Sequence, residues 1–240
     1  MNRSFPLFSA TLFATAFSAV ASTPVCLLSV GTEEATFDIA RPESMRPKAL
    51  VSESPHAESE IGKLSGPAQF FAVAENRAIA VKNEREALVA VQADRDARDR
   101  RERAALHTLS ATALGRSALN ARERFSVAVT NGLPFVPIHA DSEGFVSAPD
   151  DAVFVRLLFG EPSFSPKPPV LPNTSDTPVK GTLPVTLKAE SPRGELLLLE
   201  TFEQTAVART PDALVGAGVD KFVDYLAGEA VRTAVSKLPR

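Results

Sequence analysis

Apolar residues along the chain fall into blocks of different period, and together these blocks predict an α+β protein. The range 67–125 is rich in Ala, Glu, Arg and Leu and lacks Gly and Pro from Ala68 to Leu114, which favours helix. Alternating apolar residues and turn signals then dominate 126–209, a pattern typical of strands. In 210–240 apolar residues recur at helical spacing. We expect a long N-terminal helical region, then a small antiparallel β unit, then a C-terminal amphipathic helix.

Heptads do not persist through 67–125. Two seven-residue series begin at Phe70 and Ala74, and only half of the positions in each are apolar, so a sustained two-stranded coiled coil is not predicted. The interruption centres on 94–103, which is charged on all sides. We expect a helix with an exposed middle and packed ends. Alternation within 69–93 leaves a three-strand meander as an alternative, which the many Ala and Glu residues disfavour.

The β-rich range 126–209 contains one strong strand and one hairpin. Residues 152–159 are β-branched, aromatic and nearly all apolar, which predicts a strand at the centre of a sheet. Residues 185–190 and 195–202 form a predicted hairpin around a Ser-Pro-Arg-Gly turn. The range 160–184, between the strong strand and the hairpin, holds seven prolines, so we expect an extended Pro-rich loop. Asn173 lies in this loop and begins a glycosylation sequon.

The C-terminal range 210–240 starts with strong helix signals. Thr210 can cap the helix, Pro211 suits its first position and Asp212 favours its first turn. We expect its apolar face, which includes Phe222 and Leu226, to pack on the β-rich region. Docking to a membrane or a partner is the alternative. The balanced charge of the helix disfavours anionic lipid.

The N-terminus resembles an export signal. Arg3 is the single charged residue among the first 32, an apolar stretch follows it, and Ala19-Val20-Ala21 precedes Ser22. A basic start, an apolar middle and small residues at −3 and −1 define a signal peptide, so we expect cleavage after Ala21 and a secreted or periplasmic protein. The following range, 22–66, is polar with scattered Pro, and we expect a flexible linker with one short strand at 35–40.

Cys26 is the single cysteine, so no internal disulfide can form. Lipidation of Cys26 and an intermolecular disulfide are alternatives. The residue before it is Val25, where a lipoprotein site would have a small residue. We therefore expect an unmodified thiol.

Overall charge excludes a strongly basic nucleic-acid binder. The chain carries 26 basic and 29 acidic residues, a net charge of −3, and removal of 1–21 would make it −4. The range 94–103 has five Arg but four acids and no aromatics, so it predicts an internally paired helix surface rather than a phosphate-binding one.

Motifs that carry chemistry are missing from the sequence. His56, His107 and His139 are far apart, there is no Cys/His cluster, and no nucleophile elbow or phosphate-binding loop occurs. The adjacent acids Asp150 and Asp151 suit a solvated turn better than a catalytic pair or a calcium site. We assign no catalytic, cofactor-binding or metal-binding residue and expect no cofactor.

These observations predict an exported, non-enzymatic protein that acts through contacts with a protein partner in an envelope or extracellular assembly. Two other classes stay open. One is an exported enzyme with dispersed catalytic residues, for which His139, Asp150 and Asp151 are the first candidates. The other is a membrane-active protein that uses the helix in 210–240. The oligomeric state does not follow from the sequence.

Overall fold

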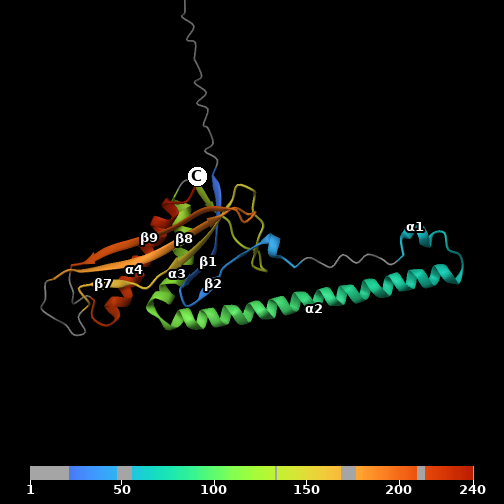
Figure 1. Ribbon diagram of the computed structural model, residues 1–240, viewed down its shortest axis with the longest axis horizontal. Helices are drawn as coiled ribbons and strands as arrows, with labels where there is room; N and C mark the ends of the chain where they lie inside the picture. The colour runs from blue at the N-terminus through green and yellow to red at the C-terminus, as the bar shows by residue number, and fades with distance from the viewer. Residues whose placement is uncertain (1–21, 48–55, 133, 169–176, 210–213, 240) are drawn as a thin grey trace, which may run out of the picture.

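The computed structural model describes residues 22–47, 56–132, 134–168, 177–209 and 214–239 (Figure 1). The expected signal peptide, the sequon at Asn173 and residues 210–212 lie outside the described residues. The C-terminal helix begins at Ala217, later than the start expected at Thr210. The elements, in chain order, are β1 (Thr23–Thr32), β2 (Thr36–Asp38), β3 (Arg41–Pro42), the 3-10 helix η1 (Glu43–Met45), α1 (Glu58–Ile61), α2 (Pro67–Ala111), α3 (Ala113–Asn131), β4 (Phe135–Pro137), β5 (Phe145–Val146), β6 (Val153–Phe159), β7 (Ser163–Ser165), β8 (Val179–Glu190), β9 (Leu196–Ala208) and α4 (Ala217–Ser236).

Seven strands form one mixed sheet. β1 and β6 pair in parallel at its centre, and β8 pairs antiparallel with β6. β2 and β4 add to β1, whereas β7 and β9 add to β8. The predicted α+β class is confirmed, and β6 occupies the central place expected for 152–159. The expected small antiparallel unit is wrong, because the sheet is larger and contains parallel pairs.

The larger sheet follows from β1. Every residue from Val25 to Thr32 is buried, and a strand covered on both faces is expected to be a continuous apolar run. In the sequence this run comes directly after the apolar N-terminus, where it does not stand out as a separate strand. The flexible linker predicted for 22–66 is therefore wrong over β1. The short strand expected at 35–40 corresponds to β2, which pairs antiparallel with the end of β1.

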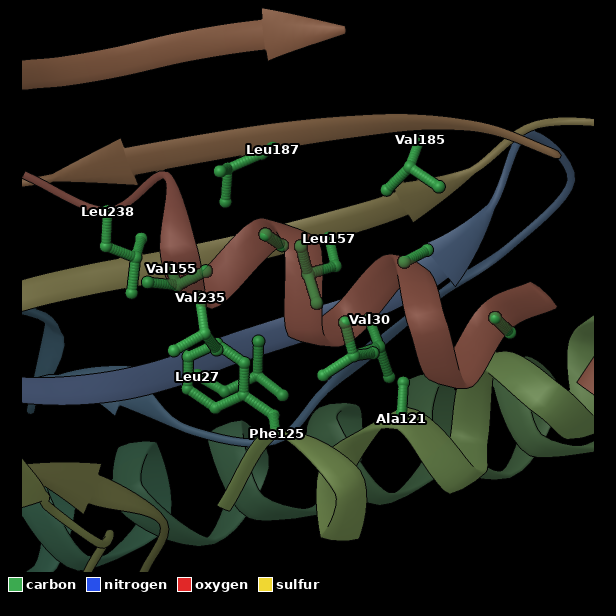
Figure 2. Close-up of a cluster of buried hydrophobic side chains, with 14 of the residues drawn as sticks. Leu27, Val30, Ala121, Phe125, Val155, Leu157, Val185, Leu187, Val235 and Leu238 are labelled. Carbon is green, nitrogen blue, oxygen red and sulfur yellow. The ribbon is translucent and has the colours of Figure 1, made fainter. Parts of the chain in front are cut away.

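α3 and α4 pack side by side on one face of the sheet and form the main core with it. Figure 2 shows Phe125 of α3 and Val235 of α4 beside Leu27 and Val155 of the sheet. The expected packing of the C-terminal helix is confirmed, since its apolar face is buried. The approach is close: a Cβ on Gly181 of β8 would lie 2.5 Å from the Phe222 ring.

Two boundaries differ from the sequence prediction. Residues 126–131 are the last turns of α3 and not a strand, because Phe125 and Val129 continue the buried face of the helix. The Pro-rich loop expected over 160–184 is wrong at its end, where β8 starts at Val179 and includes Pro184. The Pro184 carbonyl accepts a hydrogen bond from the Gly160 amide at 2.8 Å. The N–H and C=O of one strand residue face the same side, so the N–H that Pro184 lacks would have faced the end of β6. The proline therefore removes no hydrogen bond to β9.

A smaller cluster covers part of the opposite face of the sheet. Cys26, Leu28 and Phe154 pack there against Ala40 and Val146. β3 and β5 form a separate two-stranded parallel sheet that brings the latter two residues into place.

α2 is a single helix of 45 residues, so the meander alternative for 69–93 is not formed. Figure 1 shows that its N-terminal half extends away from the sheet with α1 at the far end. Thr112 interrupts the helix in an extended conformation, and its hydroxyl accepts a hydrogen bond from the Gly115 amide at 3.0 Å. A Cβ on Gly115 would clash with the Leu109 backbone, so glycine is required where the chain turns into α3.

Candidate functional site

The N-terminal half of α2, residues 67–93, exposes large apolar side chains. Phe70 is 72% exposed, Phe71 69%, Leu88 64% and Val89 69%. A soluble helix usually turns such residues toward a core. We call this segment the arm.

Four apolar residues of the arm lie along one side of the helix, and Phe71 and Val89 lie about 100° further round it. Phe70, Ala74, Val81 and Leu88 are spaced by four or seven residues, so they share a face of the helix. Fully burying a Phe or Leu side chain contributes about 1.5 to 3 kcal/mol. A partner that covered this face would therefore gain several such contributions.

At its far end the arm contacts the segment that leads into α1. The His56 amide donates to Asn76 Oδ1 at 3.2 Å, and Asn76 Nδ2 donates to the His56 carbonyl at 2.9 Å. His56 Nε2 also lies 3.0 Å from Glu75 Oε2. His56 thus has a structural position and is not part of a cluster of ligands.

The charged stretch 94–103 is where α2 meets the rest of the protein. Arg41 binds Asp94 at 3.2 Å, Arg95 binds Glu143 at 2.6 Å, and Arg98 donates to the Glu143 carbonyl. The expected exposed middle with packed ends is therefore right only in part: Leu109 near the C-terminal end is buried, but one side of the polar middle is docked and the apolar N-terminal half is not packed. Sequence reasoning did not identify the 141–144 turn as the partner of this stretch.

Arg46 is the centre of this contact. Its guanidinium binds Glu43 at 2.6 Å and Glu143 at 2.5 Å, and it also binds Asp141. Arg41 and Arg46 both lie over the Phe145 ring, at 4.4 and 4.5 Å from its centroid. We call this set of contacts the joint: the ion pair of Arg41 with Asp94, and the polar contacts of Arg46, Arg95 and Arg98 with the 141–145 turn.

The joint changes the acidity of its groups. The pKa of Asp141 is lowered, first by the hydrogen bond from the Phe145 amide at 2.9 Å and then by Arg46. Glu43 and Asp141 raise the pKa of Arg46. Both side chains are solvent-accessible, so each ion pair contributes little alone. The joint orients α2 by having several pairs along one helix.

The candidate residues for catalysis do not come together. His139 is exposed in the loop after β4 and lines a hollow that also contains Ile138 and Arg122; Asp150 and Asp151 are not among the described residues lining it. Asp150 forms an ion pair with Arg193 in the β8–β9 turn at 2.5 Å. His107 is exposed on α2.

Cys26 is 2% exposed within β1. Burial raises its pKa to about 12, so the thiol stays protonated at neutral pH. This position fits the expected unmodified thiol and conflicts with a lipid chain on Cys26 in this fold.

A groove of about 950 Å³ runs between α3 and α4. Arg124 crosses it and donates to the Asp224 carboxylate and carbonyl, both at 2.5 Å. Both acidic and basic side chains line the groove, together with Tyr225. No cysteine, serine–histidine pair or histidine cluster is among its described lining residues, so it carries no recognisable reaction chemistry.

The described part of the chain contains no group of three or more His, Cys, Asp or Glu that could hold a metal ion. No described helix is long and apolar enough to cross a membrane. The apolar face of α4 is occupied by the core, which argues against its use as a membrane-binding helix.

No protein-family model and no curated protein sequence matches the chain. Among solved structures, it is similar to a "putative lipoprotein" from Caulobacter crescentus CB15, at 13% identity over 52% of this chain and 88% of that chain. The TM-score is 0.25. A likeness of this size carries no argument about fold or function, and the function has to be argued from the geometry.

Proposed function

We propose that the chain is an exported, non-catalytic protein that holds another protein of an envelope or extracellular assembly through its arm. The exposure of Phe70, Phe71, Leu88 and Val89 on one projecting helix carries this proposal. Contiguous apolar surface on a soluble protein is typical of interaction sites. The partner that fits is an apolar helix or groove, since helices pack by burying such faces.

The joint supports this role mechanically. A contact element is most effective when its direction is set before binding, because less ordering then opposes association. The polar contacts of Arg41, Arg95 and Arg98 hold the base of α2, while the arm beyond them is available for a partner.

Export is supported by the N-terminal pattern and by where the fold begins. β1 starts at Thr23, so cleavage after Ala21 would leave every element of the described fold intact. Mass spectrometry of the native protein checks this step. A mature N-terminus at Ser22 is expected, and a chain that keeps Met1 inside the cell would contradict it.

Site-specific photo-crosslinking in living cells tests the arm. A photoreactive residue at Leu88 is expected to capture a defined protein. The same residue at Arg103, whose side chain is 79% exposed on the same helix, is the matched control and is expected to capture none. Phe70→Glu is expected to abolish capture from position 88, whereas Lys82→Glu, at a side chain 73% exposed, is expected to preserve it. Equal capture at positions 88 and 103 would overturn the proposal.

A further inference from the structure

The outer edge of β9 is open. β9 is 13 residues long and pairs with β8, and no other described strand pairs with it. Natural edge strands are usually protected by prolines, lysines, bulges or short length. β9 has no Pro and no Lys, and its ladder with β8 is regular from Val179↔Ala208 to Ala189↔Leu198, with a bulge at Leu197 near the start of the strand.

The register shows which backbone groups face the open edge. The Pro184 carbonyl accepts a hydrogen bond from the Gly160 amide, on the side of β8 away from β9. Glu203 is opposite Pro184, and the two therefore form a non-hydrogen-bonded pair. The N–H and C=O of Glu203 then point outward, and so do those of Thr201 and Thr205, because the direction alternates along a strand.

The exposed side chains beside this edge are mostly apolar. Leu197 is 44% exposed, Leu199 61% and Val207 56%. Charge is sparse: Glu200 and Glu203 are the two ionisable residues of the strand, and Glu200 already forms an ion pair with Lys237.

β9 is complementary to itself. An antiparallel copy centred on Phe202 would pair residues 198–206 with themselves, all of which lie in the regular part of the ladder. In that register Leu198 faces Ala206, Leu199 faces Thr205 and Thr201 faces Glu203. No two acids are directly opposite, since Glu200 faces Gln204. Centring the pair one residue later, on Glu203, would instead place the two Glu203 side chains against each other.

We propose that β9 is a self-association edge, through which a second copy of the chain pairs antiparallel in the register centred on Phe202. The two sheets become one continuous sheet, and the helical layers of both copies lie on the same side of it. The interface is isologous, so it closes as a dimer and leaves no free β9 edge. This surface is separate from the arm and does not depend on it.

Two substitutions of Thr201 test the register, because each copy places Thr201 opposite Glu203. Thr201→Lys is expected to tighten the dimer and Thr201→Glu to weaken it, each by about 2- to 30-fold in Kd over the two symmetric contacts. Both variants lose the same hydrogen bond to Thr186 Oγ1, so the difference between them reports the facing charge. The measurement is sedimentation velocity of the mature chain, 22–240, over a range of concentrations.

A third substitution blocks the edge without breaking the fold. Thr205→Pro removes an outward N–H and no bond of the β8–β9 ladder, as Pro184 does from the other side. It is expected to give a monomer whose unfolding midpoint matches that of the wild type at concentrations below the dimer Kd. Leu88→Glu in the arm is the control and is expected to leave the dimer intact.

Disulfide trapping provides a reading that does not depend on affinity. Thr201→Cys mixed with Glu203→Cys is expected to give more linked dimer than either variant alone, and Cys26 is too buried to interfere. A wild-type chain that remains monomeric at all concentrations would overturn the proposal. So would a dimer that Leu88→Glu abolishes and Thr205→Pro does not, an outcome that would leave the arm as the contact element.

Discussion

α2 and α3 are consecutive helices separated only by Thr112, yet their apolar side chains lie in opposite environments. In α3, Ala118, Ala121, Phe125 and Val129 are at most 3% exposed. In the arm, Phe70 and Leu88 are 72% and 64% exposed. Both helices have good helix-forming composition. Helix propensity makes both segments helical, but only α3 has a sheet against which to bury its apolar face.

The largest effect is expected from truncating a large side chain in each helix. Phe125→Ala should lower the free energy of unfolding by about 3 to 5 kcal/mol, because it leaves a cavity in the core. Leu88→Ala should change it by less than about 0.5 kcal/mol, since the side chain has little to lose. Urea denaturation of both variants checks this. Equal losses would show that the arm is packed in solution.

Enlarging a small side chain should also destabilise α3 more than the arm, but by a smaller amount than truncation does. Ala121→Leu puts extra volume where the residue is fully buried and should cost about 1 to 3 kcal/mol of stability. Ala90→Leu on the exposed side of the arm should be nearly neutral. Thermal unfolding of the pair tests the difference. A destabilising Ala90→Leu would mean that another part of the protein lies against the arm.

Breaking the joint should change the orientation of α2 more than the stability of the protein. Glu143→Ala removes the carboxylate shared by Arg46 and Arg95, and exposed pairs contribute about 0.2 to 1 kcal/mol each. The distance distribution between spin labels at positions 88 and 151 should broaden, while the unfolding midpoint moves little. Glu84→Ala, an acid in the arm outside the joint, is the control. An unchanged distribution in Glu143→Ala would show that the remaining contacts hold α2 alone.

The smallest effect is a pH dependence of the joint. Because the folded state lowers the pKa of Asp141 from 3.8, its stabilising contribution is complete well above that value and is lost as pH falls through the lower folded pKa. The stability difference between the wild type and Asp141→Asn should therefore be constant from pH 7 to about 5 and shrink below about 3.8. Urea denaturation across this range measures it. If the stability difference between the wild type and Asp141→Asn grew on acidification, the pKa of Asp141 would be raised by folding and not lowered.

Local signals predicted part of the fold well. Residues 152–159 became the central strand β6, the hairpin formed β8 and β9, and the C-terminal apolar face packed on the sheet. Each of these depends on periodicity or turn chemistry within a short segment. β1 was missed because its apolar run follows a similar run at the N-terminus, and nothing local separates a core strand from the end of an export signal.

The candidate site was less predictable. Heptad analysis located the apolar positions of the arm and the charged stretch 94–103. It predicted packing at both ends of the helix, and only the C-terminal end is packed. The reason is the joint: Arg95 and Arg98 meet Glu143, some 45 residues later in the chain. Charge on all sides of a helix is compatible with solvent or with a complementary surface, and only the fold shows which one is present.

By itself, the sequence determined the helical character of α2, the strand character of β6 and the absence of recognisable reaction motifs, because these depend on neighbouring residues. Tertiary structure decided which apolar surfaces are covered, where Pro184 is tolerated and which edge of the sheet stays open. Those properties arise from contacts between segments far apart in the chain. An apolar side chain is buried only when a second segment covers it, so the local sequence around that side chain does not determine its burial.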